Sequence, residues 1–163
     1  MKNVATLNLS GPRLRVSDPC QREACHHLTF PVNPGVWHAF IDLVDEGHPW
    51  GQRVTHLTLV RAGEDLTAPI IEEVGLLWVD AGVLGFYDDA RLPEIDPDTY
   101  DKVICSTENC RKHAFTIDDR AVFSSTGLGD GVYPLFVRRD ADGAVVAATV
   151  RYFDPDTLQE AAE

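Results

Sequence analysis

Residues 36–61, VWHAFIDLVDEGHPWGQRVTHLTLVR, carry the clearest periodicity in the chain. Side chains of an extended strand alternate between its two faces, so a period of two residues predicts a strand. In the first half of the segment, one face carries Trp37, Ala39, Ile41 and Leu43. The second half divides into a face with Leu57 and Leu59 and an opposite face with Val54, His56 and Val60. About eight polar or turn-forming residues lie between the halves, which predicts two antiparallel neighbours.

The same period recurs over most of the chain. It predicts further strands at residues 3–9, 13–17, 74–79, 83–87, 113–117, 120–125, 131–138 and 144–153. Residues 74–79, VGLLWV, are uniformly apolar and are expected to form a buried strand, with 83–87 returning as its partner. The D-x-D-G turn at 140–143 predicts a hairpin between the last two strands. A single short helix is expected at about 97–106, because Pro97 follows a capping Asp96.

These elements predict a mostly β fold. An antiparallel β-sandwich, or a strongly curved sheet, with one short helix packed at an edge would bury the alternating faces. The chain of 163 residues suits a single domain, 1–163, with a polar tail at 154–163. No apolar run approaches the roughly 20 residues of a membrane span, and the first residues lack a signal-peptide core. We therefore expect a cytoplasmic protein.

The charges are unevenly distributed. Acidic residues outnumber basic residues by 26 to 14, which gives a formal net charge of -12. Residues 1–61 carry six basic and five acidic residues, whereas residues 62–163 carry eight and 21. No cationic stripe is present for nucleic acid or for an anionic membrane surface, so neither partner is expected. The acidic half favours a cation or a basic protein partner, and solubility alone is the alternative interpretation.

Four cysteines form two C-x4-C pairs, Cys20 with Cys25 and Cys105 with Cys110. Disulfides are not expected in a reducing cytosol. One interpretation is a zinc ion held by the four thiolates, with nearby histidines as substitutes for some of them. A second is that the thiols are unrelated, since a cysteine also packs as a small apolar residue. A nucleophilic cysteine paired with a nearby histidine is less favoured, because no family-specific signature surrounds any of the four.

Residues 124–134, SSTGLGDGVYP, place glycine at three alternate positions. Such glycines permit positive φ and a close approach of backbones. A strand follows them where a phosphate-binding loop would have a helix, which disfavours nucleotide binding. We expect a tight connection between two strands, in which Asp130 caps backbone N–H groups. Calcium held by the Asp-rich turns is less favoured, because the turn at 140–143 lacks the bidentate glutamate of an EF-hand.

Known catalytic patterns are missing from the sequence. The adjacent carboxylates Glu72-Glu73 and Asp88-Asp89 would point to opposite faces of a strand. There is no G-x-S-x-G nucleophile motif and no H-E-x-x-H metalloprotease motif. His38 and His56 lie on largely apolar strand faces, where a packed histidine is the commoner explanation. These observations favour a protein that is not an enzyme.

The stretch from 124 to 153 resembles the C-terminal signature of an uncharacterised bacterial family, domain-of-unknown-function family 4241. The members of that family carry a motif that looks like S-x-G-x-GDG-x-YP. A hairpin with a DG turn follows the motif, and the last strand ends in Phe. The segment 78–88 resembles the VDsG…fxD segment of the family, and the similarity continues upstream at Asp18-Pro19, 35–37 and Arg53-Val54. The chain departs from the pattern at two positions, where it has Ala81 in place of Ser and Leu128 in place of an aromatic residue.

The resemblance implies a small, mostly β cytosolic domain with no assigned activity, and it supplies no catalytic residue. It also implies that Asp80 and Asp130 belong to one local arrangement, which would be a structural cap or a ligand site at one end of the sheet. The binding residues expected on this basis are Asp80, Gly82, Asp88, Gly129, Asp130, Gly131 and Tyr133.

Two functional hypotheses follow. The first is a non-enzymatic interaction protein that binds a basic protein partner through its acidic face, for example in a regulatory or toxin-neutralising role. The alternative is a metal-binding module or metal-dependent enzyme, which would use the Asp/Gly turns or the cysteine pairs. The first hypothesis predicts carboxylates spread over a broad face of the protein. The second predicts that the metal-ligating side chains converge on one ion. Neither hypothesis specifies an oligomeric state.

Overall fold

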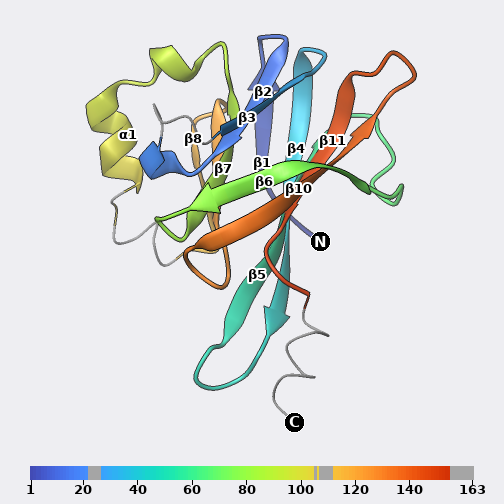
Figure 1. Cartoon of the computed structure of the whole chain (residues 1–163). Coiled ribbons are helices and arrows are strands. Elements are labelled where there is room, and N and C mark those ends of the chain that lie inside the picture. The colour runs from blue at the N-terminus through green and yellow to red at the C-terminus, as the bar shows by residue number, and fades with distance from the viewer. Residues whose placement is uncertain (22–26, 105, 107–111, 155–163) are drawn as a thin grey trace.

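The computed structural model describes residues 1–21, 27–104, 106 and 112–154. Its strands form two antiparallel sheets packed face to face, which confirms the prediction of a β-sandwich (Figure 1). The larger sheet has the order β1-β4-β5-β11-β10-β6, and the smaller sheet has the order β3-β2-β7-β9-β8. The strands are β1 (Lys2–Leu9), β2 (Arg13–Ser17), β3 (His27–Pro31), β4 (Gly35–Asp45), β5 (Gln52–Arg61), β6 (Glu72–Val79), β7 (Val83–Asp88), β8 (Ala114–Ile117), β9 (Ala121–Ser125), β10 (Gly131–Arg139) and β11 (Val145–Arg151). The helices are the 3-10 turns η1 (Pro19–Gln21) and η2 (Leu92–Glu94) and the α-helix α1 (Pro97–Ile104).

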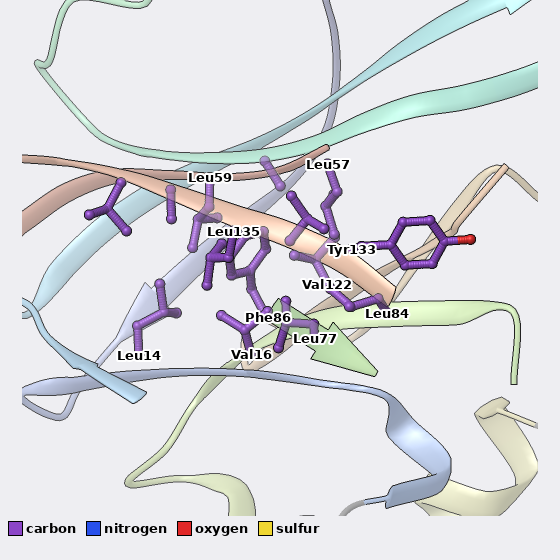
Figure 2. Packing of buried hydrophobic residues seen from close by; sticks show 14 of the residues in the cluster. Leu14, Val16, Leu57, Leu59, Leu77, Leu84, Phe86, Val122, Tyr133 and Leu135 are labelled. Atoms are coloured by element: carbon purple, nitrogen blue, oxygen red, sulfur yellow. The ribbon is translucent and has the colours of Figure 1, made fainter. Parts of the chain in front are cut away.

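The main core lies between the two sheets. Figure 2 shows Leu57 and Leu59 of the larger sheet facing Phe86 and Val16 of the smaller one. Full burial of such a side chain contributes about 1.5–3 kcal/mol, so this layer supplies most of the favourable free energy of folding. The alternation predicted for residues 36–44 is confirmed where it faces this core, since Trp37, Ala39 and Ile41 are buried.

The predicted face of Val54 is wrong. Val54 lies in the main core with Leu57 and Leu59, although a strict alternation puts it on the opposite face. The pairing of β4 with β5 passes from Asp42 opposite His56 to Leu43 opposite Val54, which leaves Thr55 as an extra residue. Such a bulge shifts the alternation by one residue, so every side chain before it changes face.

The predicted pairing of 74–79 with 83–87 is also wrong. β6 pairs with β10 at the edge of the larger sheet, whereas β7 lies in the smaller sheet between β2 and β9. The chain therefore crosses between the sheets after Val79. β6 is not fully buried either, because Leu77 and Val79 face the core while Leu76 and Trp78 face outward. An antiparallel sheet can bury one face in the core and expose the other to water. A uniformly apolar strand does not show which of its side chains lie on the buried face.

The predicted helix is confirmed as α1. The Asp96 carboxylate accepts hydrogen bonds from the Thr99 amide at 2.9 Å and from the Thr99 hydroxyl at 3.0 Å, so it caps the first turn. The helix does not lie at an edge. Tyr100 and Ile104 pack on the outer face of the smaller sheet, in a second apolar cluster that includes Phe123.

The hairpin predicted at residues 140–143 joins β10 to β11. The Asp140 carboxylate accepts hydrogen bonds from the amides of Asp142 and Ala144 at 3.0 and 2.9 Å. Most of the polar tail predicted at 154–163 lies outside the described residues. Within the part of the chain that the structure describes, no helix has the length and apolar character needed to cross a membrane.

Candidate functional site

The turns that follow β6 and precede β10 meet at one end of the sandwich. Val79 and Gly131 form the last pair of the β6–β10 ladder, and Asp80 and Asp130 are the next residues beyond it. A Cβ atom added at Gly82 would lie 3.5 Å from the Gly129 Cα and 3.9 Å from the Asp130 Oδ1. The expected binding residues that meet here are Asp80, Gly82, Gly129, Asp130 and Gly131.

The glycine turn is held by neighbouring hydroxyl groups. The Thr126 hydroxyl accepts a hydrogen bond from the Gly129 amide at 3.1 Å and donates to the Gly129 carbonyl, to which the Tyr133 hydroxyl also donates at 2.8 Å. Burial raises the pKa of Tyr133, the Thr126 bond opposes that shift, and the Asp130 charge adds to it. No described residue donates a hydrogen bond to the exposed Asp130 carboxylate, so the cap expected of Asp130 is made by Thr126.

Asp18 is the residue of this region that the sequence interpretation missed. Its carboxylate is fully buried beyond the end of β2. Oδ2 accepts hydrogen bonds from the Asp80 amide at 2.6 Å and the Ala81 amide at 2.9 Å, and Oδ1 accepts one from the Cys20 amide at 2.7 Å. The sequence did hold a signal, because Leu14, Val16 and Asp18 share one face of the strand alternation. Asp18 thus fixes the backbone that presents Asp80.

Asp88 does not join these turns. It ends β7, whereas Gly82 precedes that strand, so about 20 Å of extended chain separates them at 3.3 Å per residue. The Asp88 carboxylate is buried and accepts hydrogen bonds from the Ser10 amide and hydroxyl at 2.7 and 2.8 Å and from the Ala90 amide at 3.1 Å. These bonds hold two neighbouring loops together at the opposite end of the strand.

The proposed zinc ligands are only partly described. Cys20 is exposed on η1, and Cys25, Cys105 and Cys110 lie outside the described residues. Among the residues with a described position, no group of three or more His, Cys, Asp or Glu could hold a metal ion. The zinc and calcium interpretations therefore remain predictions.

His56 of β5 is partly buried, with its Nδ1 3.0 Å from the Thr55 hydroxyl. Burial lowers the pKa of His56 below its ordinary value of 6.5, Asp42 and Asp154 oppose this shift, and Arg151 adds to it. The unfolded chain then binds the proton more tightly than the folded chain, so stability is lost as the pH falls below about 6.5. We expect thermal unfolding from about pH 7 to about pH 5 to show a smaller loss of Tm for His56→Gln than for the wild type. A constant difference in Tm between the two proteins across this range would contradict this.

An exposed apolar surface adjoins the two carboxylates. In the β6–β10 ladder Trp78 lies opposite Val132 and Leu76 lies opposite Pro134, and these strands run side by side across the front of Figure 1. Trp78, Leu76 and Val132 remain 56%, 54% and 42% exposed. A contiguous apolar patch of this kind is typical of a contact surface. The sequence interpretation missed it because it treated the whole run 74–79 as buried.

Asp80 and Asp130 differ from many other acidic residues of this chain. Arginine side chains pair with Asp89 at 2.8 Å, with Glu46 at 3.1 Å and with Asp119 at 3.0 Å. No ion pair within the described residues involves Asp80 or Asp130. Their negative charges therefore face solvent beside an aromatic ring and aliphatic side chains, an arrangement that suits contact with cationic and apolar groups together.

Comparisons of the chain with protein-family models, with curated proteins and with solved structures found no match. The resemblance to family 4241 thus stays a prediction.

Proposed function

We propose that this protein is a non-enzymatic interaction domain that binds a basic protein partner. The binding site is the acidic–apolar surface, defined as Leu76, Trp78, Asp80, Asp130 and Val132. The observation that carries the proposal is the position of exposed Trp78 and Val132 beside two carboxylates without a described counter-charge. A regulatory or toxin-neutralising role would be one form of such binding. We also propose membership of domain-of-unknown-function family 4241, supported by the GDG-x-YP element.

The chemistry of this surface matches that of a protein interface. Tryptophan is enriched among the residues that dominate binding energy, because its large ring removes much apolar area from water. Trp78 and Val132 are directly opposite each other, so one partner group would contact both. The net charge of -12 would attract a basic partner and accelerate its association.

Affinity capture from the source cells tests the proposal with two matched tryptophan variants. Trp50 is 64% exposed at the tip of the β4–β5 hairpin, which extends away from the sheets in Figure 1. We expect a protein captured by the wild type to be retained by Trp50→Ala and reduced at least about tenfold by Trp78→Ala. The capture should also weaken at raised salt, because the attraction between exposed charges is screened.

Circular dichroism of both variants controls for folding. Equal capture by Trp78→Ala and the wild type would overturn the assignment of binding to this surface. Capture lost only in Trp50→Ala would place the interface at the hairpin tip and would overturn it as well.

A further inference from the structure

The outer face of β6 carries charge at both ends. Glu73 lies opposite Phe136, Leu76 opposite Pro134 and Trp78 opposite Val132, and residues paired across two strands share a face. The ladder is shifted between Leu135 and Phe136, so β6 has an extra residue between Glu73 and Gly75. This bulge places Glu73 on the same face as Leu76 and Trp78, although its spacing from Leu76 is odd.

The resulting pattern along the strand pair is acidic, apolar, acidic. Glu73 is exposed, and no described ion pair involves it, whereas its neighbour Glu72 pairs with Arg139 at 3.2 Å. Asp80 and Asp130 provide the negative charges at the other end. At 3.2–3.4 Å per residue, and with one residue taken up by the bulge, roughly 20 Å separates Glu73 from Asp80.

The apolar row is narrow. It is two strands wide, and neighbouring strands are about 5 Å apart. On the side toward β11, the Arg151 guanidinium lies 4.5 Å from the centre of the Phe136 ring, so a cation borders the row there. A helix, about 10 Å wide, would extend beyond this two-strand row and over Arg151. An extended segment fits within the row.

We propose that this row binds an extended segment of another protein that has an apolar centre and a Lys or Arg near each end, roughly 20 Å apart. The inference rests on the proposed function and adds the spacing of the partner's charges. The charge pattern also argues against a second copy of this chain as occupant, because carboxylates would face carboxylates.

Labelled peptides of about nine residues test the spacing directly. The first peptide has an arginine near each end, about 20 Å apart when extended, with valines between them and serine elsewhere. The second has the same composition with the arginines adjacent at its centre. We expect fluorescence anisotropy at low ionic strength to show at least about fivefold tighter binding of the first peptide. Equal affinities, or no binding of either peptide at millimolar protein, would overturn the proposal.

Charge reversal locates the contact. Glu73→Lys should weaken binding of the first peptide at least about threefold, and a version with glutamate at one end should recover affinity for that variant. Asp142→Lys is the matched control, since it makes the same change in net charge at an exposed position of the β10–β11 turn. Equal weakening by both variants would overturn the local contact in favour of general attraction to an acidic protein.

The outcomes separate the two proposals. If capture of a cellular protein depends on Trp78 while the two peptides bind equally, the charge spacing is wrong and the proposed function stands. If the first peptide binds as expected while Trp78→Ala leaves cellular capture unchanged, the spacing stands and the proposed function is wrong.

Discussion

Asp18→Ala is expected to lower the free energy of unfolding by about 3 kcal/mol, because it removes the acceptor of three backbone amides. For a domain of this size the loss corresponds to a fall in Tm of roughly 6–12 °C. Urea denaturation and differential scanning calorimetry would measure both quantities.

Asp18→Asn and Asp80→Ala are the controls. The asparagine keeps one carbonyl acceptor, so its loss should be smaller than that of Asp18→Ala. Asp80 donates its backbone amide to the Asp18 carboxylate, but the Asp80 side chain is exposed and takes no part in this bond. Asp80→Ala should therefore change the free energy of unfolding by less than about 0.5 kcal/mol. Comparable losses for Asp18→Ala and Asp80→Ala would show that Asp18 does not hold the crossover.

Gly127→Ala is expected to destabilise the protein by about 3 kcal/mol, from backbone strain and overpacking together. Gly127 has a φ of +72°, which favours glycine. A Cβ there would overlap the Val54 carbonyl oxygen and lie 2.8 Å from the Phe153 ring. Neither backbone nor buried ring can move away without disturbing the core. Thermal and urea unfolding of the purified variant would measure the loss.

Gly129→Ala is the matched control in the same turn. Gly129 also has a positive φ, of +93°, but a Cβ there would meet nothing within 4 Å. Only the backbone strain applies, so the expected loss is about 1 kcal/mol. Equal losses for the two alanine variants would contradict the predicted overlap at Gly127.

The local part of the fold was predictable because it depends on neighbouring residues. The alternation in residues 36–44 and the cap at Asp96 are local signals, and both are confirmed. The face of Val54 was not predictable, because the bulge at Thr55 is defined by the pairing of two strands. The crossover after Val79 likewise depends on contacts distant in sequence, such as those that Asp18 makes.

The candidate site was predictable only in part. The glycines and aspartates of the two turns were identified, and the structure brings Gly82 against Gly129. Asp88 was grouped with them although it lies at the other end of β7. Trp78 was missed because an apolar run does not reveal which of its side chains a second sheet covers. Glu73 lies on the outer face only because of a bulge in β6, so strict alternation would have placed it on the opposite face from Leu76 and Trp78.

The position of β11 has a consequence for synthesis on the ribosome. β11 lies between β5 and β10, so the larger sheet is joined through its centre by the last strand in the described chain. Until residues 145–151 emerge, the nascent chain has two incomplete half-sheets, each with an open edge able to pair with another chain. This sheet therefore cannot close until β11 has left the ribosome, and before that point the nascent chain has the greatest need of a chaperone.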